Sequence, residues 1–109
     1  MAFDEELAAR IRKRLARRAG VSEKKMFGGL AFLLNGNMCC GVHKREMIVR
    51  LDPNRMAEAL SQPRTRIFDL SGRPMKGWIL VELSGVADDD ALAKWLRLAT
   101  TYAATLPAK

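Results

Sequence analysis

The chain has 109 residues, of which 49% are hydrophobic and 28% charged, and 19 basic against 12 acidic side chains give a formal net charge of +7. This length fits one small domain over residues 1–109, and the composition excludes a disordered or collagen-like chain. No apolar stretch approaches the roughly 20 residues that span a bilayer, and the acidic N-terminus is unlike a secretory signal. We therefore expect a soluble, cytoplasmic domain with no membrane partner.

The first predicted element is a helix that begins after Asp4 and ends near Gly20. Leu7, Ile11 and Leu15 recur every four residues and form one apolar stripe. Asp4 is a favourable N-cap, and glycine is common just past the end of a helix. The stripe predicts that this helix packs on the rest of the domain.

Most of the net charge lies on this helix and directly after it. Residues 10–25 contain eight basic side chains and one acidic one, so this segment alone carries +7. The bases point away from the apolar stripe or flank it, which is typical of a nucleic-acid or acidic-partner surface and equally of a solvated helix face. The candidate contact residues are Arg10, Lys13, Arg14, Arg17, Lys24 and Lys25.

The next segment changes to a strand pattern. Residues 25–34 are apolar in both alternating sets, which predicts one strand that is covered on both faces and continues through Gly28 and Gly29. Glycines inside a strand allow a close approach, here expected from the first or last helix. Asn35-Gly36-Asn37 then predicts a tight turn. Two further strands, over residues 38–43 and 47–51, complete an antiparallel meander.

The second half of the chain adds two helices and two strands. Asp52 and Pro53 are the expected first residues of a short helix, and Asp88 to Asp90 cap a last one. The predicted order is α-β-β-β-α-β-β-α, an α+β sandwich with helices packed on a mainly antiparallel sheet. The expected elements are a helix over 53–61, a strand over 66–70, a turn over 71–74, a strand over 75–83 and a helix over 88–105.

The cysteines and the one histidine do not predict a metal site. Cys39 and Cys40 are adjacent on a strand, so their side chains should point to opposite faces, and no second Cys/His pair completes a tetrahedral site. We expect two buried thiols, a surface position for His43, and neither a metal nor another cofactor. Two adjacent thiols also suit a reducing compartment better than a disulfide framework.

Basic and aromatic residues outside the first helix allow two further interpretations. Residues 73–78 combine two bases with Trp78, a mixture that can grip a single nucleic-acid strand, although Trp78 also suits a core position. A small-molecule site or an enzyme would need convergent polar groups such as Arg50 and Lys76 in a concave pocket. No nucleophile or general base is evident, so we expect a protein that is not an enzyme.

Two motifs together resemble the TfoX N-terminal domain family. The first runs from Lys25 through Met26, Phe27, Gly28 and Gly29 to Phe32. The second consists of Pro74, Met75, Lys76 and Gly77. The resemblance covers nearly the whole chain and implies a fold related to the α+β sandwich of secretion chaperones. The resemblance supplies no catalytic residues, and we expect both motifs to be chiefly architectural and to line a shared groove.

The resemblance also implies a function. Proteins of the TfoX/Sxy type are competence regulators that promote transcription of DNA-uptake genes in bacteria, alongside a cyclic-AMP-responsive activator. Longer regulators of this kind carry a second domain that is not present in this sequence. We expect a regulatory or adaptor domain that contacts nucleic acid, or a protein of the transcription machinery, through its basic helix. The alternative is a homodimeric protein-interaction module that binds no nucleic acid.

Overall fold

The computed structural model of the protein describes residues 3–26, 28–69 and 75–109. Within these residues a six-stranded sheet is accompanied by three α-helices and two short 3-10 helices, so the predicted α+β class is confirmed. The elements are α1 (Glu5–Leu15), β1 (Val21–Met26), β2 (Gly29–Leu34), β3 (Asn37–His43), β4 (Glu46–Arg50), η1 (Pro53–Arg55), α2 (Met56–Leu60), β5 (Thr65–Ile67), β6 (Trp78–Glu82), η2 (Leu83–Gly85) and α3 (Asp89–Ala103).

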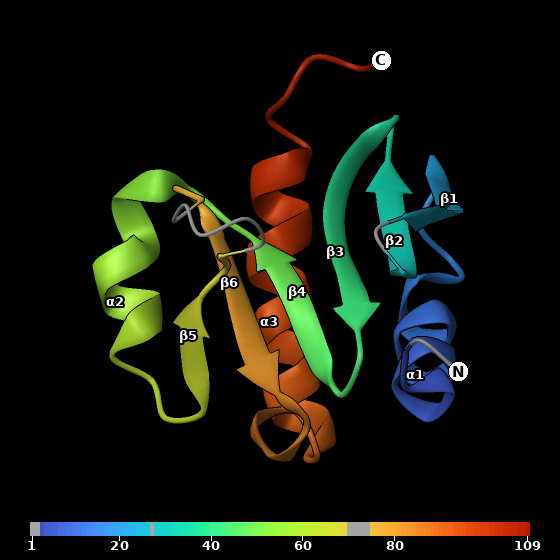
Figure 1. Cartoon of the computed structure of the whole chain (residues 1–109). Coiled ribbons are helices and arrows are strands. Elements are labelled where there is room, and N and C mark those ends of the chain that lie inside the picture. The colour runs from blue at the N-terminus through green and yellow to red at the C-terminus, as the bar shows by residue number, and fades with distance from the viewer. Residues whose placement is uncertain (1–2, 27, 70–74) are drawn as a thin grey trace.

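The strands lie in the order β1-β2-β3-β4-β6-β5, and neighbouring strands are antiparallel throughout the described sheet (Figure 1). Residues 35 and 36 connect β2 to β3 with φ angles of 54° and 84°. Positive φ at both central positions defines the hairpin turn whose twist matches that of its strands. The turn predicted at Asn35-Gly36 is therefore confirmed.

The single strand predicted over residues 25–34 is wrong, because this segment forms the end of one strand and the whole of the next. β1 and β2 pair with each other, and Met26 is opposite Gly29. Gly28 has a φ of 74°, which is a turn conformation and interrupts any straight strand. The glycines therefore lie at a hairpin between two strands, and β1 begins in the polar segment at Val21.

Other predicted elements exist but are shorter than expected. α1 ends at Leu15, and Gly20, with a φ of 83°, accepts a hydrogen bond from the Asn35 amide at the start of β1. β6 begins at Trp78, because Gly77 has a φ of 88° in the turn before it. The helix predicted over 53–61 begins with a 3-10 turn, and the turn predicted over 71–74 lies outside the described residues.

One face of the sheet carries the main core. Buried side chains of α1 and α3 join those of the strands in a single cluster that includes Ile11, Phe32 and Leu92. α3 runs behind the sheet in Figure 1, α1 lies near β1 and β2, and α2 lies beside β5. The opposite face holds a smaller cluster around Ile48 and Leu80. α1, which carries three arginines, and α3, which carries Arg97, therefore pack on the same side of the sheet.

Candidate functional site

A groove of about 530 Å³ lies between the C-terminal end of α1 and the middle of α3. Its floor is apolar, since Leu15 and Leu96 are only 5% and 4% exposed and belong to the main core. Four exposed arginines make the rest of its lining basic. We call this feature the arginine groove, and it is lined by Arg14, Leu15, Arg17, Arg18, Ala93, Leu96, Arg97 and Thr100.

The local structure of α1 places three of these arginines together. Leu15 is the last residue of the helix and faces the core, so Arg14 lies at the border of the buried stripe. The amide of Arg18 donates a hydrogen bond to the carbonyl oxygen of Leu15 at 3.0 Å, which holds Arg17 and Arg18 in a turn directly after the helix. Cations here also suit the negative end of the helix dipole.

α3 supplies the fourth arginine and much of the floor. Arg97 follows the buried Leu96, which directs it to the exposed side of the helix next to α1. Ala93 is half-buried, and its small side chain leaves the groove open. The hydroxyl of Thr100 donates to the Leu96 carbonyl oxygen at 2.9 Å within the helix. The polar character of the groove therefore comes mainly from its guanidinium groups.

The arginines of the groove have no acidic partners. Three ion pairs occur within the described part of the chain, namely Arg10–Asp89, Arg12–Glu23 and Arg66–Glu46, and none includes a residue of the groove. No aspartate or glutamate is among the residues that line it. Four positive charges around one hollow repel each other and attract an anion. The arginine groove is therefore the candidate binding site.

Arg10, the first predicted contact residue, has a structural partner. Its guanidinium donates to Oδ1 of Asp89 at 3.0 Å and to the Ala87 carbonyl oxygen at 3.3 Å. The hydrogen bond from Arg10 holds the pKa of Asp89 below its usual value, and the charges of Arg14 and Lys13 add to this effect. Arg10 therefore connects α1 to the start of α3 and is less available to a ligand.

Arg12 is held in a similar way by the neighbouring strand. Its Nε and Nη2 donate to the two carboxylate oxygens of Glu23 at 2.6 and 2.8 Å. This paired hydrogen bonding holds the pKa of Glu23 below its ordinary value of 4.5. The ion pair fixes α1 against β1 and removes Arg12 from the set of available cations.

The structure brings together only part of the predicted contact surface. Arg14 and Arg17 line the groove, Lys13 is exposed on α1 outside it, and Lys24 and Lys25 are exposed on the edge strand β1. Arg97 was missed by the sequence reasoning, and Arg18 was placed only at the flank of the stripe. Nothing in the local pattern of α3 distinguishes Arg97, because its role depends on the packing of α3 against α1.

The first family motif forms the β1–β2 hairpin. A Cβ atom on Gly29 would overlap the carbonyl oxygen of Val42, so the predicted close approach is confirmed, but it comes from strand β3 and not from a helix. Gly28 has a φ of 74°, a backbone conformation that favours glycine. Met26 ends β1, and Phe27 lies outside the described residues.

The second family motif forms the turn before β6. The carbonyl oxygen of Gly77 accepts a hydrogen bond from the Leu51 amide at 2.8 Å, and Met75 packs on the cluster around Ile48. Lys76 is exposed in the turn, and Pro74 lies outside the described residues. β2 and β3 separate the strand of Met26 from β4, which carries Ile48. The two motifs therefore lie apart on the sheet.

The two cysteines are buried as predicted, but they do not point to opposite faces. Their Sγ atoms are 3.9 Å apart, and both side chains belong to the main core. The register of β2 and β3 shifts beside them, since Phe32 is opposite Cys40 and Leu33 is opposite Met38. This β-bulge breaks the alternation of side chains. The hydrogen bond with Cys39 and burial raise the pKa of Cys40 well above its usual range.

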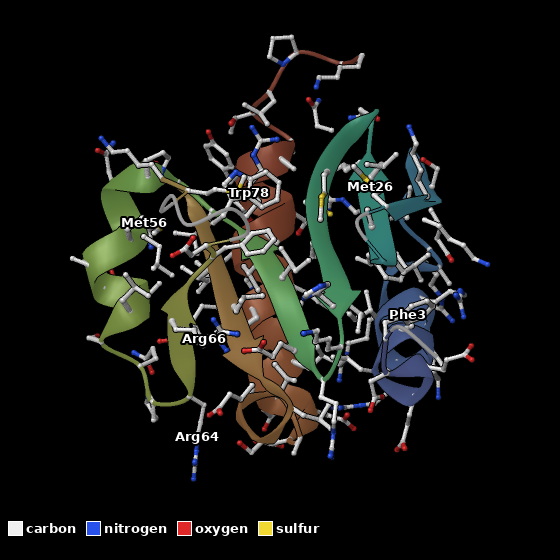
Figure 2. All side chains as sticks on the ribbon, viewed as in Figure 1. Phe3, Met26, Met56, Arg64, Arg66 and Trp78 are labelled. Atoms are coloured by element: carbon white, nitrogen blue, oxygen red, sulfur yellow. The ribbon has the colours of Figure 1, made fainter. Side chains whose placement is uncertain are left out.

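Arg50, considered above as part of a small-molecule site, is covered by aromatic rings. Its guanidinium carbon lies 5.0 Å from the ring centre of Trp78 and 5.7 Å from that of Tyr102. Trp78 also packs against Phe68 and is labelled near β6 in Figure 2. This cluster engages the Arg50 guanidinium in cation–π contacts, while Lys76 is exposed in its turn. His43 ends β3 and is half-buried rather than on the open surface.

Neither a metal-holding cluster nor a membrane-spanning helix occurs within residues 3–26, 28–69 and 75–109. No three His, Cys, Asp or Glu side chains of this part of the chain lie close enough together to hold a metal ion. No helix in the same ranges is long and apolar enough to cross a bilayer.

The fold and the groove define a small α+β domain whose two packed helices present a basic hollow with an apolar floor. The chain belongs to the TfoX N-terminal domain family, whose sequence pattern matches residues 13–103. The match includes all four arginines of the groove and both glycine motifs. No curated protein and no solved structure matches the chain. The likeness to secretion chaperones therefore stays a prediction.

Proposed function

We propose that this chain is a non-enzymatic, cytoplasmic regulatory domain of bacterial competence or transcription, and that it binds nucleic acid through the arginine groove. Family membership supports the regulatory, competence-related role. The observation that carries the binding role is the group of four exposed arginines that line one groove with no acid among them.

The chemistry of the guanidinium group favours phosphate as the partner. Arginine presents several planar donors that match two oxygens of a phosphate at once, and it stays charged at every physiological pH. Arg10 and Arg12 already use this geometry on carboxylates within the domain. The arginines of the groove have the same donors and form none of the ion pairs found among the described residues. Phosphate oxygens can therefore accept hydrogen bonds from them without displacing a carboxylate.

A regulatory role also needs a protein partner. An activator or another part of the transcription machinery would meet the domain while nucleic acid occupies the groove. The β5 edge and α2 lie at the far end of the sheet from β1, and this leaves surface for such a contact.

Salt dependence tests the proposal. Binding of a fluorescent duplex DNA is measured by anisotropy between about 50 and 200 mM salt, where each neutralised phosphate contributes a slope of about −0.9 to the log–log plot. We expect a slope of about −2 to −4 for up to four arginine contacts. The variant Arg17→Glu with Arg18→Glu should lose at least about tenfold in affinity, since two contacts become repulsive.

The control is Arg45→Glu, a charge reversal of an exposed base in the β3–β4 turn. Its affinity should stay within about twofold of the parent protein, because it lies outside the groove. Absence of any binding at about 50 mM salt, or equal losses in the control, would refute the proposed function.

A second candidate function, the homodimeric module without nucleic-acid binding, has one observation in its favour. β1 ends the sheet, and its outer edge pairs with no other strand of the described residues. A second copy could continue the sheet there, although the charged side chains of Glu23, Lys24 and Lys25 disfavour pairing of this edge with another strand. A dimer mass in sedimentation, together with no binding of nucleic acid, would support this candidate over the first.

A further inference from the structure

The arginine groove is shallow, but it differs from a purely basic surface because apolar side chains form its floor. The phosphates of a duplex lie on its outside, and its bases are stacked within. A duplex would therefore satisfy the arginines but would not cover the apolar part of the lining, where Ala93 is half-buried and Leu15 and Leu96 are packed in the core beneath it. The floor is complementary to a flat, apolar group that enters between the arginines.

We propose that the arginine groove holds an unpaired nucleotide, so that the domain prefers single-stranded nucleic acid to duplex. This proposal rests on the proposed function and names the form of nucleic acid that the same site recognises. Its basis is the combination of four guanidinium groups, an apolar floor and a volume of about 530 Å³ in one groove.

The size of the groove favours a nucleotide over an acidic protein segment. Sites for small ligands measure roughly 300 to 1,000 Å³, whereas a stable protein interface buries about 800 Å² on each partner and takes 20 or more residues. Eight residues line the arginine groove. One base with its phosphate fits this scale.

The arginine side chains can contact both parts of a nucleotide. A guanidinium plane stacks on an exposed base, and its edge donates to phosphate oxygens. Arg97 approaches the groove from α3, while Arg14, Arg17 and Arg18 approach from α1. The base would rest on the apolar floor with a guanidinium above it, and the remaining cations would hold the flanking phosphates.

The first test compares two forms of one sequence with the whole chain. The protein is titrated into a fluorescent DNA strand of about 15 nucleotides and, separately, into the duplex of the same sequence. Binding is followed by fluorescence anisotropy at about 50 mM salt. We expect the strand to bind at least about tenfold more tightly, because stacking of a base adds to the phosphate contacts. If the duplex binds as tightly as the strand, this inference fails and the proposed function stands. If neither binds, the proposed function itself fails.

The second test fills the groove without changing its charge. Ala93→Leu adds a larger side chain at the floor, and leucine suits a helix nearly as well as alanine. The preference for the single strand, taken as the ratio of the two affinities, should fall at least about fivefold. The matched control is Ala91→Leu, on the same helix but outside the lining of the groove, which should retain the preference.

A variant that conserves charge tests the same inference without adding volume to the groove, so its result does not depend on whether Ala93→Leu disturbs the fold. Arg97→Lys retains the positive charge of an exposed residue and removes the planar group that stacks on a base. The single-strand preference, taken as the ratio of the two affinities, should fall about threefold or more, because only the single strand presents an exposed base to the guanidinium plane. Arg45→Lys, in the β3–β4 turn, is the control and should change neither. An unchanged preference in both Arg97→Lys and Ala93→Leu would overturn the inference.

Two competitors decide between other ligands of the same groove. Free adenosine monophosphate should displace the labelled strand only weakly, because it supplies one phosphate where the strand supplies several. Poly-glutamate at the same concentration of charge should also displace it weakly, since it has no flat ring for the floor. Equal competition by the mononucleotide would assign the groove to a small ligand, and equal competition by poly-glutamate would assign it to an acidic protein. Either result would overturn the inference.

Discussion

At the scale of single residues, seven arginines of this domain form two groups that have different surroundings. Arg10, Arg12 and Arg66 each donate to a carboxylate, and Figure 2 shows Arg66 extending from β5 toward β4, where Glu46 accepts its hydrogen bonds. Arg14, Arg17, Arg18 and Arg97 line a groove that contains no acid. Counting charges along the sequence treats both groups alike, so it locates the basic helix but does not show that Arg10 and Arg12 are paired with acids.

The Arg12–Glu23 pair predicts a specific dependence of stability on pH. The pKa of Glu23 is lowered in the folded protein, so the pair stabilises the fold above the ordinary pKa of 4.5, and this contribution is lost as the pH falls through the lowered value. Both side chains are partly exposed, so Glu23→Gln should lower the free energy of unfolding at pH 7 by only about 0.5 kcal/mol.

Urea unfolding at pH 7 and at pH 3 measures this effect. The difference between Glu23→Gln and the parent protein should shrink at the lower pH, because Glu23 is then increasingly protonated in both states. Glu58→Gln, a change at an exposed residue of α2, is the control and should show no such difference. A gap between variant and parent that is the same at both pH values would contradict the assignment.

The two glycines of the β1–β2 hairpin should respond differently to substitution. Gly29→Ala places a methyl group against the Val42 carbonyl of the neighbouring strand, and we expect a loss of about 3 kcal/mol in the free energy of unfolding. Gly28→Asn should cost only a few tenths of a kcal/mol, since asparagine tolerates positive φ and no atom of the described residues outside its chain neighbours lies within 4 Å of a Cβ placed there. Thermal or chemical unfolding compares the two, and equal losses would show that the turn and not the close strand contact limits stability.

At the scale of elements, the main error of the sequence reasoning has a clear physical cause. β2 is buried over most of its length on both faces, so its residues show no alternation that would mark where it begins. β1 is an edge strand with four exposed residues in succession, and it carries no apolar pattern at all. A covered strand and a polar edge strand therefore merged into one predicted strand. The capped helices and the Asn35-Gly36 turn were predictable because their signals are local.

The cap of α1 provides the test at this scale. Oδ1 of Asp4 accepts a hydrogen bond from the Leu7 amide at 2.8 Å, which satisfies one of the free donors at the start of the helix. Asp4→Ala should lower the free energy of unfolding by about 1 kcal/mol, whereas Asp4→Ser should retain most of it. Urea unfolding followed by circular dichroism measures both variants. Equal stability of the alanine and serine variants would mean that the cap contributes little.

At the scale of the whole molecule, the site arises from how two distant helices meet. α1 and α3 are separated by the entire sheet in sequence, yet both pack on the same face and contact each other. The apolar stripes predict that each helix packs on the sheet, but they do not specify which helices become neighbours. Arg97 therefore joins Arg14 only through tertiary packing, and sequence patterns alone could locate the basic helix but not the groove.

This origin separates the effect of the groove from that of the total charge. Replacing a base by glutamate changes the charge by two, so Arg14→Glu with Arg97→Glu and Lys24→Glu with Lys25→Glu both lower the formal net charge from +7 to +3. The first pair lies in the groove and the second on β1. The groove variant should lose at least about tenfold in affinity for nucleic acid at about 50 mM salt and should have a shallower salt slope.

The β1 variant should stay within about threefold of the parent protein, since Lys24 and Lys25 are outside the groove and long-range attraction is screened beyond about 10 Å at 0.1 M salt. Anisotropy titrations of both variants against the same labelled strand measure the difference. Equal losses would mean that the domain attracts nucleic acid through its overall charge, and a larger loss in the β1 variant would move the interface to the edge of the sheet. A loss confined to the groove variant requires the contact between α1 and α3, because neither helix alone holds all four arginines.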